Sequence, residues 1–202
     1  MAPRLRLALV VTGTLALAAI AAVLAFAVGD RTASGAGFEG ALRPPGIPPA
    51  RIDLPDEHGR LVRMSEMRGK PVVVTFLYTT CEDSCPLTAA QIRGALDELG
   101  HDVPVVAVSV DPGNDTPARA RSYSFEQQMT GRMRWVLGDR GGLQRIWRAY
   151  GVQPQGDGAE HSASTVLLDG DGRQRVGFST DVLTSEALAH DIALLEDEAA
   201  ES

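Results

Sequence analysis

The stretch "VVVTFLYTTCEDSCPLT", residues 72–88, joins a continuous apolar run to two cysteines and a proline. The run at 72–78 is typical of a strand that is buried on both faces of a sheet. Pro86 suits the first turn of a helix, and the apolar spacing after it predicts that helix. Cys81 therefore falls in the loop after the strand, and Cys85 falls where the helix begins. A buried strand that leads directly into a helix indicates an α/β fold.

The chain on either side of this stretch predicts the rest of a mixed sheet flanked by helices. Its predicted elements are a hairpin and helical turn over 55–71, a buried strand over 103–110, a helix from Pro117 after a Thr116 N-cap, a strand over 133–138, a helix over 141–151, a hairpin over 164–179 and a helix after Thr184. In a sheet of this kind the ligand site lies at the carboxyl ends of the parallel strands. Cys81 is expected at that edge.

The N-terminal segment predicts a membrane anchor. Residues 7–28 carry no charge and are long enough to span a bilayer, which takes roughly 20 apolar residues. Arg4 and Arg6 precede them, which predicts a cytoplasmic N-terminus and a domain on the extracytoplasmic face of the cell membrane. The alternative is a cleaved signal peptide, because "AFA" at 25–27 has the small-residue pattern of a cleavage site.

Composition then divides the chain into three parts. Residues 1–28 are the membrane anchor or uncleaved signal, residues 29–50 form a Pro/Gly-rich tether, and residues 51–202 form the globular domain. The net charge of -7 argues against a nucleic-acid partner, because no basic stripe is present to neutralise phosphates.

The two cysteines are the only ones in the chain, and they allow a disulfide staple, a redox couple or a metal site. A staple would stabilise little, since closing so short a loop contributes about 2 kcal/mol or less in the loop-entropy account. The three residues between them depart from the C-x-x-C spacing of an ordinary dithiol enzyme. A helix N-terminus lowers the pKa of a thiol placed on it, which predicts that Cys85 is more activated than Cys81. Glu82 and Asp83 oppose this effect, because nearby carboxylates disfavour a second negative charge.

A metal site needs a further ligand, and the histidines are the candidates. His58, His101 and His190 are expected on the surface, whereas His161 stands in the polar, glycine-rich loop "GDGAEHSAST" before the hairpin. Two thiolates and an imidazole form a soft ligand set that suits Cu(I), and that accepts Cu(II) with an added oxygen or nitrogen ligand.

Three motifs together resemble the Sco/SenC family of copper-binding, thioredoxin-like proteins, which help to build the copper centre of cytochrome c oxidase. They are "GKPVVVTFLYTTCEDSCPLT", "VSVDPGNDTP" and "HSASTVLLDGDG", in the family's order. The resemblance implies a thioredoxin-like fold, with Cys81, Cys85 and His161 as copper ligands and with thiols that can also form a disulfide. It also implies that Asp111 supports its loop. The chain departs from the family pattern at Glu82, where a proline is common.

Two functions follow from the resemblance and stay open at this point. The first is a copper metallochaperone that delivers the ion to the copper-binding subunit of cytochrome c oxidase. The second is an enzyme, a thiol-disulfide reductase that acts on the cysteines of the oxidase copper site. Both use Cys81 and Cys85, so the sequence does not separate them. A peroxidase of the peroxiredoxin type is disfavoured, because the expected P-x-x-x-T-x-x-C arrangement is missing.

Overall fold

The computed structural model describes residues 37–49, 51–153 and 164–201. The predicted anchor over residues 7–28 and the predicted ligand His161 lie outside these ranges. Within them, none of the helices combines the length and the apolar character that crossing a bilayer requires.

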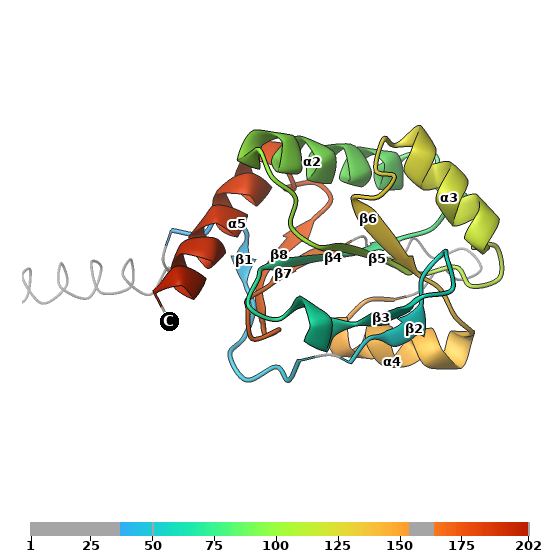
Figure 1. Cartoon of the computed structure of the whole chain (residues 1–202), viewed down its shortest axis with the longest axis horizontal. Helices are drawn as coiled ribbons and strands as arrows, with labels where there is room; N and C mark the ends of the chain where they lie inside the picture. The colour runs from blue at the N-terminus through green and yellow to red at the C-terminus, as the bar shows by residue number, and fades with distance from the viewer. Residues whose placement is uncertain (1–36, 50, 154–163, 202) are drawn as a thin grey trace, which may run out of the picture. The chain divides into compact units, whose positions relative to one another are not determined.

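Six strands form one mixed sheet in the order β1-β8-β7-β4-β5-β6 (Figure 1). Their bounds are β1 (Ala41–Leu42), β4 (Val72–Leu77), β5 (Val105–Ser109), β6 (Met133–Val136), β7 (Ser164–Leu168) and β8 (Gln174–Ser179). The three strands β4, β5 and β6 are parallel, whereas β7 runs antiparallel to β4 and β8 antiparallel to β7. The predicted mixed α/β sheet is therefore confirmed.

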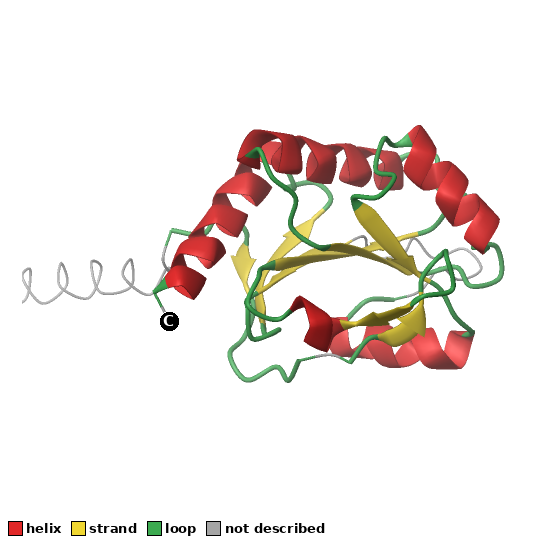
Figure 2. Cartoon of the chain, viewed as in Figure 1, coloured by secondary structure: helices red, strands yellow, loops and turns green. Residues whose placement is uncertain are grey.

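Helices cover both faces of this sheet (Figures 1 and 2). The remaining elements are the hairpin of β2 (Asp53–Pro55) and β3 (Leu61–Arg63), the 3-10 helix η1 (Met64–Met67), α2 (Ser84–Leu99), α3 (Pro117–Glu126), α4 (Arg140–Tyr150) and α5 (Ser185–Ala200). Figure 1 shows α2, α3 and α5 on one side of the sheet, and α4 with the small hairpin on the other.

The buried strand β4 supplies side chains to two separate cores, because successive residues of a strand point to opposite faces. Val73 and Leu77 belong to the cluster that α2, α3 and α5 cover. Val74 and Phe76 belong to the cluster that α4 and the hairpin cover. Burial on both faces is why residues 72–78 read as an unbroken apolar run rather than as an alternating one.

Local signals in the sequence mark the helix ends correctly. The Thr116 side chain accepts a hydrogen bond from the backbone N–H of Arg119 at the start of α3, and Thr184 accepts one from Ala187 at the start of α5. Gly100 and Gly151 end α2 and α4 in the left-handed conformation, which glycine adopts without steric cost.

The second half of the predicted tether belongs to the compact domain, which begins at Phe38. The edge strand β1 pairs with β8, so that Ala41 lies opposite Gly177. The carboxylate of Asp191 is fully buried and accepts hydrogen bonds from the backbone N–H groups of Glu39 (2.8 Å) and Gly40 (2.9 Å). Composition alone predicts a linker here, because the partner of these backbone groups lies about 150 residues further along the chain.

Gly40 is required for this close approach to the sheet edge. A Cβ atom at this position would collide with Cγ1 of Val176 and would lie 2.7 Å from Cζ of Phe178. Both contacts are well inside van der Waals distance, so a larger residue would push β1 away from β8.

Candidate functional site

The two thiols meet where β4 passes into α2, as predicted. Cys81 lies in the loop after the strand, and Cys85 is the second residue of α2. Both are free cysteines; Cys85 is fully buried and Cys81 is 8% exposed. The backbone N–H of Cys85 donates a hydrogen bond to Sγ of Cys81 over 3.2 Å, and Oγ of Ser84 lies 3.5 Å from the same sulfur. The Cys81 sulfur is therefore held over the first turn of the helix.

This sulfur takes the place of a side-chain cap on α2. Asp83 occupies the N-cap position, but its side chain makes no capping hydrogen bond. The first N–H groups of a helix have no partner within the helix, and they concentrate the positive end of the helix dipole. Because the Cys85 N–H points at Cys81, the helix stabilises negative charge on Cys81 rather than on Cys85.

The pKa shifts of the two thiols have opposite signs. Burial raises the pKa of Cys81, but hydrogen bonds from the Cys85 thiol, Ser84, the Cys85 N–H and Tyr78 outweigh it and lower the pKa below its usual value. Burial raises the pKa of Cys85 strongly, and the neighbouring Cys81 raises it further. The prediction that Cys85 is the more activated thiol is therefore wrong, because burial raises the pKa of Cys85, whereas Cys81 gains several hydrogen bonds, one of them from the Cys85 N–H.

Asp115 holds the cysteine loop in place. Its Oδ1 accepts hydrogen bonds from the backbone N–H and from the hydroxyl of Thr79, each over 2.7 Å, and its Oδ2 accepts one from the hydroxyl of Ser109. Burial raises the pKa of this carboxyl, although the hydrogen bonds from Ser109 and Thr79 oppose the shift. The carboxylate thus ties the loop before Cys81 to the end of the neighbouring strand β5.

Asp111, four residues earlier, is expected from the sequence to support its own loop. In the structure the carbonyl oxygen of Asp111 accepts hydrogen bonds from the N–H groups of Asn114 and Asp115, and its carboxylate accepts one from the Asn114 amide. Asp111 therefore supports its own turn, as expected, whereas Asp115 holds the cysteine loop. The Asp-Thr-Pro motif could have pointed to Asp115, but nothing in the sequence identifies Thr79 as its partner.

The floor of the site is aromatic and apolar. Cys85 belongs to the buried cluster that contains Leu77, Tyr123 and Trp135, and the rings of Tyr123 and Trp135 meet edge to face with centroids 5.4 Å apart. Burial raises the pKa of Tyr123, and the two nearby sulfurs raise it further. A charge on Cys85 is thus costly unless a cation shares the site.

The described residues contain no group of three His, Cys, Asp or Glu side chains that could hold a metal ion. The third predicted ligand, His161, lies outside them. His58, His101 and His190 are about half exposed (50%, 51% and 47%) and each lies beside a carboxylate, which confirms that they are surface residues. The described part of the site is therefore a pair of sulfurs, and the predicted three-ligand metal site is not tested by the described residues.

Comparison with known proteins gives a consistent result. The family model described as SCO1/SenC matches residues 50–195. Protein SenC of Rhodobacter capsulatus is 32% identical over 126 residues, which is 57% of this chain and 56% of that protein. A putative copper-binding protein of Stutzerimonas stutzeri is 25% identical over 138 residues, or 62% of this chain and 66% of that one. The chain therefore spans between half and two thirds of the length of these curated relatives.

A solved structure is similar over most of its length. The structure of Bradyrhizobium japonicum ScoI with copper bound superimposes with a TM-score of 0.62 at 30% identity, and the match covers 72% of this chain and 98% of that one. The likeness confirms the thioredoxin-like arrangement that the sequence motifs imply.

Proposed function

Because the chain belongs to the SCO1/SenC family, we propose that it is a copper chaperone that carries one copper ion on Cys81 and Cys85. The recipient is the copper-binding subunit of cytochrome c oxidase during assembly of the enzyme. The observation that carries the proposal is the pair of adjacent, buried sulfurs, one of which is already biased toward the thiolate. Copper in the Bradyrhizobium ScoI structure and in the name of the Stutzerimonas relative supports it.

The chemistry of the two sulfurs suits copper(I). Thiolates are soft ligands that select Cu(I) over harder divalent ions. The lowered pKa of Cys81 makes its thiol easier to ionise, whereas burial raises the pKa of Cys85, which must lose its proton when the metal binds. The apolar floor excludes water, so the cation supplies the charge that makes ionisation of Cys85 favourable.

His161 is the proposed third ligand. Support comes from Ser164, which follows it by three residues and begins β7. Thr165 pairs with Thr75 on β4, so β7 begins at the same end of the sheet at which β4 leads to Cys81. Three residues span at most about 10 Å, which keeps the imidazole within reach of this end of the sheet.

Delivery requires the site to be open to the recipient on one side. Cys81 is 8% exposed as a residue, whereas Cys85 is fully buried. An incoming ligand of the recipient therefore displaces Cys81 first, and Cys85 releases the ion last. The predicted anchor over residues 7–28 would hold the domain on the membrane face that carries the oxidase copper centre.

Copper titration of the reduced full-length protein in detergent tests this function. We expect one Cu(I) per chain in competition with a chelator, loss of tight binding in Cys81→Ser and in Cys85→Ser, and weaker binding in His161→Ala. His101→Ala is the matched control, because His101 pairs with Glu196 on the surface. Unchanged binding in His161→Ala would remove His161 from the site, and unchanged binding in both serine variants would refute the proposal.

A second candidate is the thiol-disulfide reductase, which the opposite pKa shifts of the two thiols favour. The Cys81 thiolate would attack one sulfur of a partner disulfide, form a mixed disulfide and release the other partner sulfur as a thiolate. Cys85, once deprotonated, would then attack Cys81, form the Cys81–Cys85 disulfide and release the second partner thiol. Two electrons pass from this pair to the partner, and the attacking thiol is the exposed one of lower pKa.

Trapping separates the two candidates. A reductase predicts that copper-free Cys85→Ser accumulates a mixed disulfide with a disulfide-bonded peptide through Cys81, and that Cys81→Ser does not. Mass spectrometry of the trapped adduct measures this. A protein that binds copper as proposed but forms no adduct in Cys85→Ser is a chaperone without reductase activity.

A further inference from the structure

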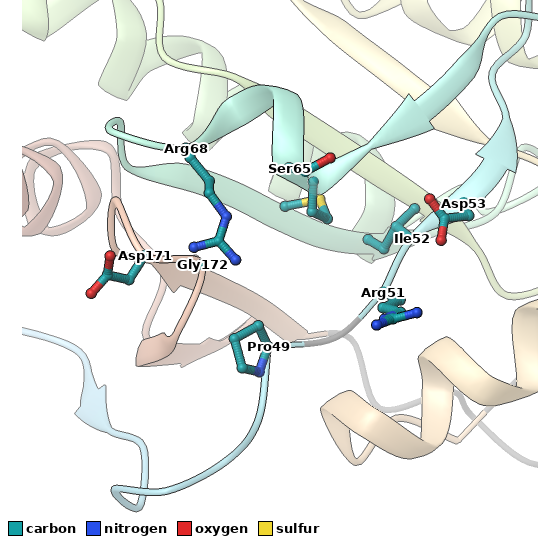
Figure 3. Close-up of a pocket in the computed structure, with 9 residues that line it drawn as sticks. Pro49, Arg51, Ile52, Asp53, Ser65, Arg68, Asp171 and Gly172 are labelled. Atoms are coloured by element: carbon teal, nitrogen blue, oxygen red, sulfur yellow. The ribbon is translucent and has the colours of Figure 1, made fainter.

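The two ends of β4 present different polar groups. A hollow of about 450 Å³ lies beside η1 at the amino end of the strand, next to the β7–β8 turn (Figure 3). Its charged lining residues are Arg51, Arg68, Asp53 and Asp171. Opposite charges are thus present in equal number, which favours neither an anion nor a cation as a ligand. At the carboxyl end, by contrast, the strand leads directly to Tyr78, a residue that contacts both thiols.

Tyr78 is held in place from both faces of the sheet. The residue is half-buried, and its side chain packs against the apolar clusters on either side of β4. Its carbonyl oxygen accepts a hydrogen bond from the backbone N–H of Cys81 over 3.3 Å, which closes the turn between the strand and this cysteine. Because ring and backbone are both fixed, the position of the Tyr78 hydroxyl relative to Cys81 is fixed as well.

Tyr78 forms hydrogen bonds with both sulfurs. Its hydroxyl donates to the sulfur of Cys81, and its backbone N–H donates to the sulfur of Cys85. A tyrosine hydroxyl keeps its proton at neutral pH, so it can act as this donor throughout copper binding and release. The N–H of Cys85 and the Oγ of Ser84 lie 3.2 Å and 3.5 Å from the same Cys81 sulfur. The Tyr78 hydroxyl thus belongs to a set of polar groups gathered around Cys81.

The hydroxyl reaches the less deeply buried of the two thiols. Cys81 is 8% exposed, whereas Cys85 is fully buried in an apolar cluster. A recipient that approaches the pair therefore meets Cys81 first, at the sulfur that already accepts the hydroxyl. Hydrogen bonds to a charged acceptor are stronger than those to a neutral one. The bond from Tyr78 is therefore strongest when Cys81 carries a full thiolate charge that no metal ion shares.

We propose that Tyr78 is a positioning residue for copper transfer, whose hydroxyl stabilises the Cys81 thiolate while the ion leaves it. This inference rests on the proposed chaperone function. In the step concerned, a ligand atom of the recipient forms a bond to Cu(I), the bond between Cu(I) and Cys81 breaks, and its electron pair stays on the sulfur. The oxidation state of copper does not change. The Tyr78 hydroxyl, already directed at that sulfur, donates to the pair as the bond breaks, and Cys85 holds the ion until a second recipient ligand arrives.

Transfer of Cu(I) from the loaded full-length protein in detergent to the chelator bathocuproine disulfonate tests the proposal. Tyr78→Phe removes the hydroxyl and keeps the ring. Tyr150→Phe is the matched control, because Tyr150 is also buried, its ring packs on Phe76, and its hydroxyl has no partner among the described residues. Stopped-flow absorbance of the chelator complex measures the transfer rate, and competition at equilibrium measures affinity. The sulfur-to-copper charge-transfer absorption of the Cu(II)-loaded protein reports the hydrogen bonds to the sulfurs.

We expect Tyr78→Phe to bind one Cu(I) per chain and to transfer it roughly tenfold more slowly, because a hydrogen bond to a charged group contributes at least this factor. Its charge-transfer absorption should move to longer wavelength, whereas Tyr150→Phe should match the wild type in both measurements. A site that is merely loosened would release copper faster, so faster or unchanged transfer in Tyr78→Phe overturns the role of Tyr78 and leaves the chaperone function standing. Absence of Cu(I) binding in the wild type would instead overturn the function on which the inference rests.

Discussion

Replacement of Asp115 by alanine should loosen the cysteine loop without touching either sulfur. The Asp115 carboxylate accepts three hydrogen bonds, two of them from Thr79 in the loop that leads to Cys81. With alanine at this position, the backbone N–H of Thr79 and two hydroxyl groups lose their acceptor. The hydroxyls can turn to other partners or to water, but the Thr79 N–H is fixed in direction by the backbone.

The expected loss of stability is smaller than the sum of three bonds. Hydrogen bonds to a charged group contribute about 1.5–3 kcal/mol each, and a donor left without a partner costs about 1–3 kcal/mol. Burial raises the pKa of Asp115, and its hydrogen bonds from Ser109 and Thr79 oppose only part of this shift. We therefore expect Asp115→Ala to lower the free energy of unfolding by about 2–4 kcal/mol.

Asp115→Asn is the matched control, because its amide oxygen can still accept both bonds from Thr79 while the buried charge is removed. We expect it to cost about 1 kcal/mol or less. Urea unfolding measures global stability, and the alkylation rate of Cys81 in native conditions measures opening of the loop. A local loss of about 2 kcal/mol corresponds to a roughly 30-fold larger open population and a proportionally faster alkylation.

Two results would contradict this reasoning. If Asp115→Ala unfolds at the same urea concentration as the wild type and its Cys81 is alkylated at the same rate, the carboxylate does not hold the loop. If Asp115→Asn is as unstable as the alanine variant, the charge rather than the hydrogen-bond geometry is what matters.

Further measurements test other parts of the structure. Iodoacetamide should modify Cys81 at least about tenfold faster than Cys85, because its pKa is lower and the residue is less completely buried. Equal rates by mass spectrometry would contradict the assignment of the activated thiol. Gly40→Ala should lower the free energy of unfolding by about 1–3 kcal/mol. Gly141→Ala is the control, because the nearest atom to its Cβ would be 3.7 Å away, and it should leave the free energy of unfolding unchanged. An unaffected Gly40→Ala would show that β1 is not held against β8. Burial raises the pKa of Asp56, but hydrogen bonds from neighbouring backbone N–H groups and arginines hold it below its ordinary value. The contribution of Asp56 to the free energy of unfolding is therefore present above the ordinary carboxyl pKa of about 4. It is lost as the pH falls through the lower pKa that this group has in the folded state. In Asp56→Asn the free energy of unfolding should therefore change less with pH in the acid range. Copper at about 100 times its dissociation constant should raise the free energy of unfolding by about 2.7 kcal/mol in the reduced protein, and chelation should reverse the effect in a thermal melt.

The sequence by itself determined the order of strands and helices and the place of the two cysteines. Unbroken apolar runs mark strands that are buried on both faces, and Thr116, Thr184, Gly100 and Gly151 mark helix ends through hydrogen bonds and backbone conformations formed within a few residues. Such signals depend only on neighbours in the chain, so they can be read without the fold.

Only the tertiary structure decided which sulfur is activated, what holds its loop and where the domain begins. Each depends on groups that the sequence alone does not bring together. The pKa of Cys81 depends on its burial and on hydrogen bonds from Cys85, Ser84 and Tyr78. The loop depends on a carboxylate 36 residues from Thr79, and the first strand depends on Asp191, which is 151 residues from Gly40. Composition indicates the conformation that a residue prefers by itself. Which group forms a hydrogen bond with a buried polar group depends on how the elements pack, and that packing depends on the whole chain.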